Sequence, residues 1–405
     1  MIYDIIIIGS GISGLYTAYN IKKMSPNTRV LILEKYKKKW VGGRTSNETY
    51  YGTEIVTGAG IGRRKKDKLL FKLIRELGLD TYNFTTKAEY SDFIPEINMK
   101  SVIQRLRKSY SGQHITFKKF AIDVLGETEY NHFKIAFGYT DYENEDAYDT
   151  LYSYGMEDNT EDLDAFYVPW RKMVLSLASE LNIHFSKNVN KITKMENKPY
   201  CFLIETESGT NYKCDKVVVA TTITGIRHLL PNKIYKDIEG QPFLRLYAKF
   251  SAKSIPIMKE YVKKYTYLTG PLQKIIPMDS DIGVYMIAYN DNKNALKLKD
   301  KLENTEQNWL FYSDLIEKSL GIPKHSVEIL DIKDFYWAIG THYYKPLNTS
   351  LYKNRDEFIH IAQHPTDGIL VVGEVISKNQ GWTEGALESV ESVLTKKWIH
   401  SELSK

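Results

Sequence analysis

Three glycines near the N-terminus have the spacing that binds a dinucleotide phosphate. They lie in the segment Gly9-Ser10-Gly11-Ile12-Ser13-Gly14, which has the pattern G-x-G-x-x-G. In this pattern Gly9 permits a tight turn, Gly11 admits a pyrophosphate close to the backbone, and Gly14 lets a helix pack closely on a strand. Phosphate oxygens would accept hydrogen bonds from the free N–H groups at the start of that helix.

An acidic residue completes this pattern, because Glu34 follows Gly14 by twenty residues. A carboxylate at this distance is placed to accept hydrogen bonds from a ribose diol. An acid at this position, rather than an arginine, argues against the 2′-phosphate of NADP. We therefore expect a dinucleotide that lacks this phosphate.

The residues around the glycines predict the elements that must position them. Residues 5–8 form a short β-branched run bounded by glycine, which predicts a strand buried on both faces. Apolar residues at helical spacing from Ile12 onward predict a helix that begins inside the glycine turn. A second predicted strand, residues 29–33, ends at Glu34. The unit is therefore strand, glycine turn, helix, strand and acid.

The next motif, Gly42-Gly43-Arg44, follows Glu34 closely. Together with the glycine turn and the ribose acid, it resembles the flavin-containing amine oxidase family, which includes monoamine and polyamine oxidases. The resemblance implies that these elements hold FAD, with Gly42 and Gly43 near the flavin and Arg44 facing the pyrophosphate. It also places Lys35 in the cofactor site. An arginine suits a pyrophosphate because its planar fork pairs with two oxygens.

The C-terminal part of the chain carries a second group of motifs similar to those of this family. Gly373-Glu374 ends a predicted strand at residues 368–372, where the family has G-E. Residues 381–389 read GWTEGALES, similar to the family's G-Y-x-E-G-A-x-x-S. The resemblance implies that Glu374, beside Gly373, meets the ribityl chain. It also implies that Thr383 begins a helix whose N-terminus faces the flavin and stabilises negative charge there.

Two further positions belong to the site that the resemblance implies. Val189 corresponds to a family position that contacts the adenine through its backbone. Lys249, in a predicted strand at residues 244–250, corresponds to the lysine that holds a water near flavin N5. A cation there would stabilise a reduced, anionic flavin. The alternative is a strand lysine that only extends its charge into solvent.

The amine in this family is held by a cage with two aromatic walls. Trp382 has the position of the second wall, where its ring could stack on an amine or hold an ammonium. The alternative is that Trp382 is a core residue. The first wall falls on His342 or Tyr343, and the sequence does not decide between them. Some members have a cysteine here that is bonded to the flavin; this chain has none nearby, so we expect non-covalent FAD.

Composition excludes several classes of protein. The 405 residues carry 55 basic and 50 acidic side chains, and a net charge of +5 does not indicate a nucleic-acid partner. Cys201 and Cys214 provide no disulfide framework, which fits a reducing compartment. No signal peptide or membrane-spanning run is apparent. We expect a soluble cytoplasmic protein without a membrane anchor, and the sequence leaves a homodimer open.

The histidines do not predict a metal site. His360 and His364 are four residues apart, a spacing that would suit a metal-binding pair on a helix. We predict instead that they flank a strand that passes into a turn ending at Pro365. We therefore expect no metal ion.

One segment is unusually acidic. Tyrosines are interleaved with ten acids, and no lysine or arginine occurs between Lys134 and Arg171. The acids are Asp141, Glu143, Glu145, Asp146, Asp149, Glu157, Asp158, Glu161, Asp162 and Asp164. One interpretation is an aromatic, acidic rim that gathers a cationic amine. We favour the other, a solvated acidic surface, because runs of charge usually face water.

A chain of 405 residues is longer than one hydrophobic core usually supports, so two domains are expected. The resemblance implies an α/β fold with a doubly wound, Rossmann-like FAD-binding domain. We assign residues 1–80, 165–240 and 336–400 to this discontinuous domain. An inserted α+β substrate domain takes residues 81–164 and 241–335. Local patterns add helices over residues 68–77 and 170–181 and a hairpin over residues 201–213.

The function that the resemblance implies is FAD-dependent oxidation of a small amine, a monoamine or a polyamine, to an imine and then an aldehyde. Oxygen would be reduced to hydrogen peroxide. Three alternatives stay open. The chain could oxidise or desaturate a non-amine substrate, it could be a flavin isomerase that consumes no net oxygen, or it could bind the flavin without amine oxidase activity.

Overall fold

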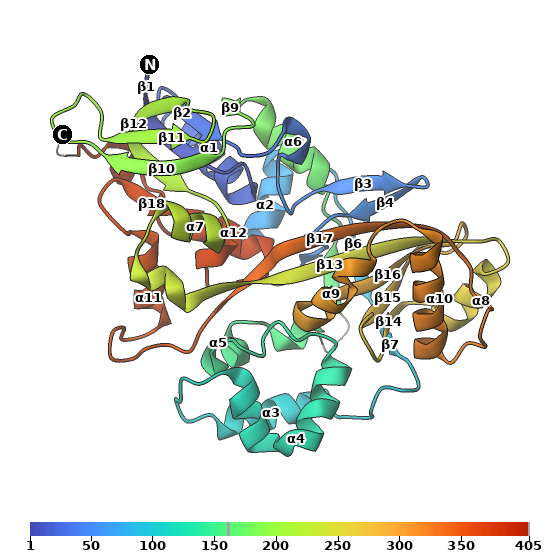
Figure 1. Ribbon diagram of the computed structural model, residues 1–405. Coiled ribbons are helices and arrows are strands. Elements are labelled where there is room, and N and C mark those ends of the chain that lie inside the picture. Colours follow the sequence, from blue (N-terminus) through green and yellow to red (C-terminus); the bar gives the residue numbers. More distant parts are fainter. Residues whose placement is uncertain (160–162, 404–405) are drawn as a thin grey trace.

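An N-terminal Rossmann-like sheet organises the computed structural model, which describes residues 1–159 and 163–403 (Figure 1). Across these residues seven strands form the sheet, in the order β10–β11–β12–β1–β2–β9, with β18 beside β12. β1, β2, β9, β12 and β18 are parallel, whereas β10 and β11 extend the sheet in antiparallel fashion. The strands are β1 (Ile2–Ile8), β2 (Val30–Leu33), β9 (Ile183–His184), β10 (Val189–Lys194), β11 (Phe202–Thr206), β12 (Asn211–Val219) and β18 (Ile369–Val371).

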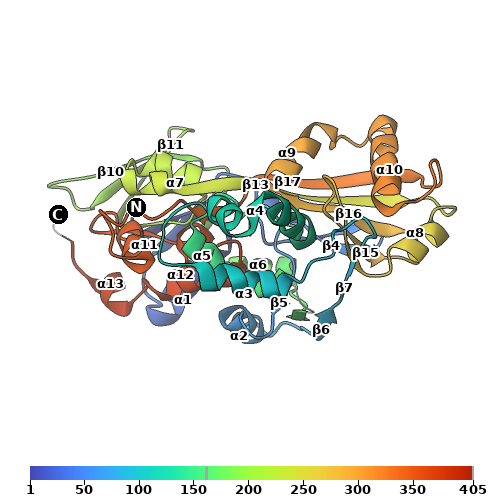
Figure 2. The same cartoon turned by 90° about the horizontal axis from the view of Figure 1, so that it is seen from below.

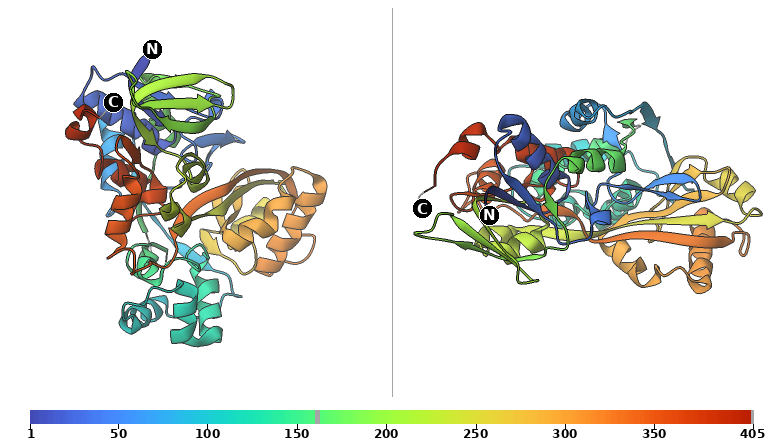
Figure 3. Two further views of the ribbon diagram at one scale, coloured as in Figure 1. Left: turned by 60° about the vertical axis from the view of Figure 1, so that its left-hand side comes forward. Right: turned by 90° about the horizontal axis from the view of Figure 1, so that it is seen from above.

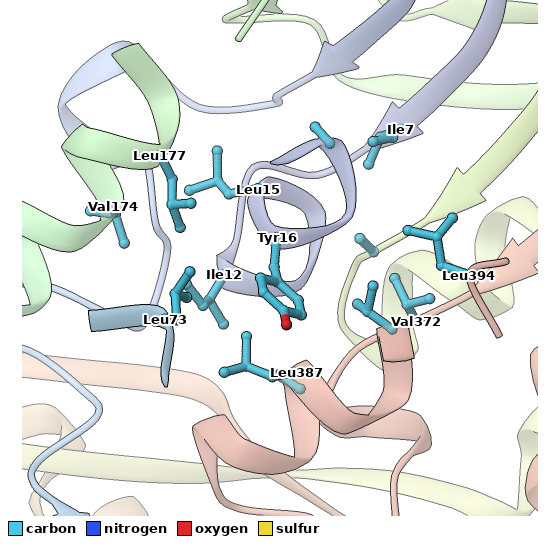
Figure 4. Close-up of a cluster of buried hydrophobic side chains, with 14 of the residues drawn as sticks. Ile7, Ile12, Leu15, Tyr16, Leu73, Val174, Leu177, Val372, Leu387 and Leu394 are labelled. Atoms are coloured by element: carbon cyan, nitrogen blue, oxygen red, sulfur yellow. The ribbon is translucent and has the colours of Figure 1, made fainter. Parts of the chain in front are cut away.

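Both faces of β1 are buried, as the apolar run of residues 5–8 predicted. Ile5 and Ile7 face a core shared with α1, α2, α6 and α12, whereas Ile6 and Ile8 face a core shared with α7 and α11. In the first core, side chains from the four helices point toward one another (Figure 4). The helices of the first core are α1 (Ile12–Met24), α2 (Lys68–Glu76), α6 (Trp170–Ser179) and α12 (Thr383–Glu391), and those of the second core are α7 (Ile223–Leu229) and α11 (Arg355–Gln363). Helices therefore cover both faces, and the predicted α/β fold class is confirmed.

A second sheet extends from the first one. Its order is β17–β13–β16–β15–β14–β7, six strands within the described part of the chain. The long strands β13 and β17 run from the Rossmann-like part to the far end of this sheet, near α8 (Figure 1). The strands are β7 (Ala88–Tyr90), β13 (Ile238–Phe250), β14 (Tyr265–Tyr267), β15 (Lys274–Asp279), β16 (Val284–Asp291) and β17 (Ile329–Tyr344). A core of its own joins this sheet to α8 (Ile255–Tyr261), α9 (Asn292–Leu298) and α10 (Glu306–Leu320).

Three helices form a separate layer below the junction of the two sheets (Figure 2, and Figure 3, left). They are α3 (Met99–Ser109), α4 (Phe117–Phe137) and α5 (Ala147–Tyr152), and an aromatic-rich core holds them together. The remaining elements are β3 (Asn47–Tyr50), β4 (Thr53–Val56), β5 (Gly62–Arg63), β6 (Asn83–Thr86), β8 (Leu163–Phe166) and α13 (Lys396–His400). Among the described residues, none of the helices combines the length and apolar composition needed to cross a lipid bilayer.

Local predictions mostly agree with the structure. The helices expected over residues 68–77 and 170–181 are α2 and α6, and the expected hairpin is formed by β11 and β12. The prediction for His360 and His364 was wrong, because α11 contains His360 and ends at Gln363, one residue before His364. Their rings lie 4.5 Å apart between centroids, and His364 Nδ1 bonds the His360 carbonyl oxygen. The two-domain division by residue number stays a prediction.

Candidate functional site

The glycine turn between β1 and α1 contains two crowded glycines and one open glycine. A methyl group built on Gly9 would lie 2.4 Å from the Ala220 carbonyl oxygen, and one on Gly14 would lie 2.0 Å from the Gly9 carbonyl oxygen. Gly9 also has a φ of +107°, which a side chain rarely adopts. The same methyl group on Gly11 would meet nothing within 4 Å. The turn therefore has open space at the glycine that must admit a phosphate.

The second glycine motif lies against the first. The Gly42 N–H donates to the Ser10 carbonyl oxygen at 2.9 Å, and Gly42 pairs with Gly11 as an isolated bridge. Close packing holds this contact, because a methyl group on Gly42 would lie 2.8 Å from Val174. Gly43 lies on the open side of Gly11. A methyl group built on Gly43 would have Gly11 Cα as its nearest neighbour, at 3.9 Å. Two segments thirty residues apart thus form one glycine-lined surface.

Glu34 reaches the same turn from the end of β2. One carboxylate oxygen accepts hydrogen bonds from the N–H and the hydroxyl of Ser10, both at 2.7 Å. The other oxygen accepts from the Tyr36 N–H at 2.8 Å. The side chain is thus fixed at the edge of the turn, where an acid that binds a ribose is required. Lys35, predicted to lie in the cofactor site, is exposed beside it.

A buried carboxylate, Glu374, collects four donors from separate parts of the chain. These are His342 Nδ1 at 2.6 Å, the His342 N–H at 2.9 Å, the Gly381 N–H at 2.7 Å and Arg44 Nη1 at 3.3 Å. Arg44 also donates to the Gly340 carbonyl oxygen. Burial raises the pKa of Glu374, but His342, Arg44 and the Gly381 N–H outweigh it and lower the pKa to about 2. Glu374 therefore ties β17, the Gly42–Gly43 motif and the start of α12 together.

The structure separates the two candidates for the first cage wall. The His342 ring is buried, and its Nε2 accepts a hydrogen bond from the Ile223 N–H at 3.2 Å. Since Nε2 accepts, Nδ1 carries the proton that Glu374 receives. Both ring nitrogens are therefore used inside the protein. Tyr343, the next residue of β17, is half-buried in a small pocket that Asp141 and Gly381 also line.

Trp382, predicted as the second cage wall, has a cation on its ring. The Arg63 guanidinium carbon lies 3.7 Å from the centre of the Trp382 ring, a distance typical of a cation–π contact. Asp67 and Asp158 hold Arg63 in place, at 2.7 and 2.9 Å. The sequence analysis did not identify Arg63. The only feature near it in the sequence is Asp67, four residues later, a spacing that suggests an ion pair. Such a pair does not indicate a contact with the distant Trp382.

The contacts of Lys249 lie at one end of β13. Lys249 is the next-to-last residue of β13, at the end toward α8. Its Nζ donates to the carbonyl oxygens of Phe250 and Ile282, and lies 6.0 Å from the Tyr51 ring centre. These contacts join Lys249 to the far end of the sheet and to none of the predicted cofactor residues. The predicted role beside the flavin therefore gains no support.

Arg245, on the same strand, is the cation at the junction of the two sheets. Its Nε donates to the Gly58 carbonyl oxygen at 2.7 Å, and its Nη2 would lie 3.1 Å from a methyl group on Gly60. The same segment bonds Arg44, because the Ala59 N–H donates to the Arg44 carbonyl oxygen. Arg245 precedes the predicted Lys249 by four residues, and register shifts in the pairing of β13 with its neighbours make the place of a single cation on this strand hard to read from the sequence.

The remaining predicted positions lie around these contacts. Thr383 is the first residue of α12, whose N-terminus the Glu374–Gly381 bond holds beside β17. Gly373 has a φ of +131°, and its N–H donates to the Ser389 hydroxyl at 2.7 Å. Val189 begins β10 and is buried against the outer strands of the first sheet. Their contacts with FAD stay predictions.

The middle of the acidic segment is buried, and the alternative interpretation as a rim stays a prediction, since Asp141 and Glu145 line the small pocket beside Tyr343. Glu143, Glu145, Asp146 and Asp149 are at most 5% exposed, so the favoured expectation of a solvated surface was wrong. Asp146 and Asp149 share Arg355, and Asp146 also bonds His114 Nδ1 at 2.7 Å. Glu161 and Asp162 lie outside the described residues.

Burial and neighbours set the protonation of these acids. Burial raises the pKa of Asp149 to about 6, although Arg355 opposes the shift. Burial likewise raises the pKa of Glu145 well above its usual range. The charges of Asp146 and Asp149 act inside the helical layer and support the fold, whereas Glu145 also lines the small pocket beside Tyr343.

Comparisons with known proteins agree with this geometry. Residues 7–77 match the family model of the NAD(P)-binding Rossmann-like domain. Two engineered forms of putrescine oxidase, made to redesign its cofactor binding, superpose on the chain with TM-scores of 0.75 and 0.73. Each covers 97% of this chain and 98% of its own, at 14% identity. The chain has the fold of putrescine oxidase. At the level of the fold, the resemblance to flavin-containing amine oxidases is therefore confirmed.

A sequence relative has the same extent. An uncharacterized protein of Acanthamoeba polyphaga mimivirus is 21% identical over 480 residues, covering 97% of this chain and 93% of the relative. Both the putrescine oxidase fold and this likeness thus span almost the whole chain. At such identities the fold is shared, whereas the substrate must be argued from the side chains of this chain.

Proposed function

We propose that the chain is an FAD-dependent oxidoreductase. The observation that carries this proposal is the open face of Gly11 between the crowded Gly9 and Gly14, with Gly42 bonded alongside. Glu34 is fixed at the edge of this turn, where it would bind the adenosine ribose. When bound, FAD would supply a two-electron acceptor that can pass its electrons to oxygen.

Particular side chains would hold this cofactor. Arg44 is half-buried beside the glycine surface, where its charge would face the pyrophosphate. The N-terminus of α12, which begins at Thr383, would stabilise negative charge near the flavin. Cys201 and Cys214 are buried in the core beneath β11 and β12, so we propose that the FAD is held without a covalent bond.

We further propose that the substrate is an amine, oxidised to an imine with oxygen as the final acceptor. The shared fold with putrescine oxidase supports this, together with an aromatic residue, Trp382, at the start of α12. Arg245 is the residue that we assign to charge stabilisation at the domain junction, in place of Lys249. The amine would have to react in its neutral form, so the rate should rise with pH through the apparent pKa of the substrate.

A specific observation also favours the second candidate, a non-amine substrate that carries negative charge. Arg63 already places a cation on the Trp382 ring, so that face does not need an ammonium. Arg245 is 4% exposed and makes no ion pair within the described residues, although a buried guanidinium normally has an anionic partner. An anionic group of the substrate would provide one.

The absorbance spectrum of the purified protein tests these proposals in order. Flavin bands that acid precipitation releases into solution would support non-covalent FAD. Anaerobic bleaching by putrescine, spermidine, tyramine or benzylamine would support an amine substrate. Bleaching only by carboxylates with an adjacent C–H bond would favour the second candidate. A protein that binds no FAD when FAD is added would contradict the cofactor assignment.

A further inference from the structure

A strongly basic and aromatic loop lies beside the cofactor site and has no role in the proposed reaction. It is the lysine loop, residues 35–40, which reads Lys-Tyr-Lys-Lys-Lys-Trp. All six residues are exposed, with Tyr36 at 54% and Trp40 at 39%. Exposed large aromatic side chains next to clustered charge are a mark of interaction surfaces.

The four lysines of this loop are exposed to solvent. None of its four lysines belongs to a salt bridge among the residues that the structure describes. The nearest acid along the chain, Glu34, is already bonded to Ser10 and Tyr36. Arg171 adds a further cation, because its guanidinium donates to the carbonyl oxygens of Lys39 and Val41, at 3.2 and 3.3 Å.

The loop is also held in one conformation. Residues Lys38–Trp40 form a single 3-10 turn, closed by hydrogen bonds from Trp40 to Lys37 and from Val41 to Lys38. The Ser186 N–H fixes the Tyr36 carbonyl oxygen at 3.0 Å. Little backbone entropy would therefore be lost when the lysines meet an anionic partner.

We propose that the lysine loop docks the protein on an anionic lipid surface, an inference that goes beyond the proposed function and does not depend on it. Four or more clustered lysines are the sequence mark of attraction to anionic headgroups. Tyrosine and tryptophan are the residues that settle at a membrane–water boundary, and Tyr36 and Trp40 flank the three consecutive lysines of the loop. Lys35 and Lys39 lie over their rings, at 4.9 and 5.3 Å, so charge and ring would reach the headgroups together.

Nucleic acid is the competing partner, and the geometry favours lipid. Proteins that bind single strands combine a positive groove that follows the backbone with several stacking aromatics. The lysine loop is one short exposed turn, and lysines already lie over both of its rings. A flat, dense array of headgroups needs only such a local contact.

Vesicle flotation of the full-length protein tests the proposal. Vesicles with 30% phosphatidylserine should bind the protein, whereas pure phosphatidylcholine vesicles should not, and 0.5 M salt should release it. The variant Lys37→Gln/Lys38→Gln/Lys39→Gln should lose about a hundredfold in affinity, since each lysine near an anionic surface contributes about 1 kcal/mol. It leaves Lys35 in place and should melt like the wild type.

A matched control removes the same charge from α9 and the 3-10 turn that follows it. Lys297→Gln/Lys299→Gln/Lys301→Gln, at the end of α9, should bind the vesicles as the wild type does. Equal binding of both triple variants would overturn the proposal, because charge anywhere would then suffice. Equal binding of the wild type to both kinds of vesicle would also overturn it. A single-stranded oligonucleotide bound more tightly than the vesicles, through the same lysines, would make nucleic acid the partner and reject the lipid surface.

Discussion

The two ends of the candidate site differ in what builds them. Around Gly9, Gly14 and Gly42 the surface is made of backbone, and a methyl group built on any of the three would lie 2.0 to 2.8 Å from a neighbouring atom, which leaves no room for a side chain. Around Trp382 and Arg245 it is made of long side chains that come from distant parts of the chain. The first end is fixed by steric exclusion, whereas the second depends on which charged groups meet.

This difference separates what the sequence predicts from what it does not. Where backbone segments or a phosphate must approach closely, only glycine fits, and these glycines stand at a fixed spacing. A pattern of a few residues therefore describes the first end almost completely. At the second end, a cation on a strand reaches the Gly58 segment only from one particular position along that strand. Arg245 and Lys249 lie on the same strand, and only Arg245 bonds the Gly58 segment.

The largest expected effect lies in the acidic segment, whose central acids are buried in the helical layer. Arg355 pairs with both Asp146 and Asp149 and is 7% exposed. The substitution Arg355→Met would leave two buried carboxylates without their cation, which should lower the free energy of unfolding by about 3 to 5 kcal/mol. Urea unfolding followed by circular dichroism measures this loss.

A control for this prediction is the exposed pair Lys22–Glu180 on the cofactor side. Lys22→Met should change the free energy of unfolding by less than about 1 kcal/mol, because exposed ion pairs contribute little. If both variants lost the same small amount, the acidic segment would be a solvated surface after all.

The acidic segment also shows why part of the structure was unpredictable. Its charge pattern alone favours water, and the partners that bury it, His114 and Arg355, lie 32 and more than 200 residues away. Periodicity reports which residues of one element share a face, so it recovered α2, α6 and the central strand. It does not report which distant cation will neutralise a carboxylate.

Two matched glycine substitutions separate folding from cofactor binding. Gly14→Ala places a methyl group 2.0 Å from a carbonyl oxygen, so it should lower the free energy of unfolding by about 3 kcal/mol. Gly11→Ala meets no protein atom, so the apoprotein should melt as the wild type does while its affinity for FAD falls at least about tenfold. Thermal unfolding and FAD titration measure the two effects. A wild-type FAD affinity for Gly11→Ala would contradict the phosphate assignment.

The junction between the two ends has a predicted pH dependence. The folded pKa of Glu374 is about 2, below its usual value near 4.5. A depressed acid stabilises the fold above its unfolded pKa, and this contribution is lost as pH falls from about 4.5 toward 2. The difference corresponds to about 3 kcal/mol. Glu374→Gln should remove this part of the acid sensitivity, measured by unfolding between pH 2 and pH 6.

Glu384, ten residues later, provides a control with the opposite sign. It accepts hydrogen bonds from the N–H groups of Leu69 and Leu70, yet burial outweighs them and raises its pKa. A raised acid costs stability as pH rises through the folded pKa. Glu384→Gln should therefore leave the loss of stability below pH 4.5 in place. An identical pH profile for both variants would show that Glu374 is not the group responsible.

Substitutions of Arg245 and Lys249, the two cations compared on β13, should change stability least. They test most directly whether the two ends of the site differ. Under the proposed function, Arg245→Met should slow anaerobic flavin reduction by about thirtyfold and lower the flavin reduction potential, because a cation near the cofactor stabilises its reduced form. Lys249→Met should leave both within about twofold, since its Nζ bonds only strand-end carbonyl oxygens. Arg245→Lys, which keeps the charge, should recover part of the potential. If Lys249→Met shifted the potential instead, the sequence-based prediction of Lys249 would be correct. The side chains at this end of the site would then be as predictable from sequence as the glycines are, and the contrast between the two ends would disappear.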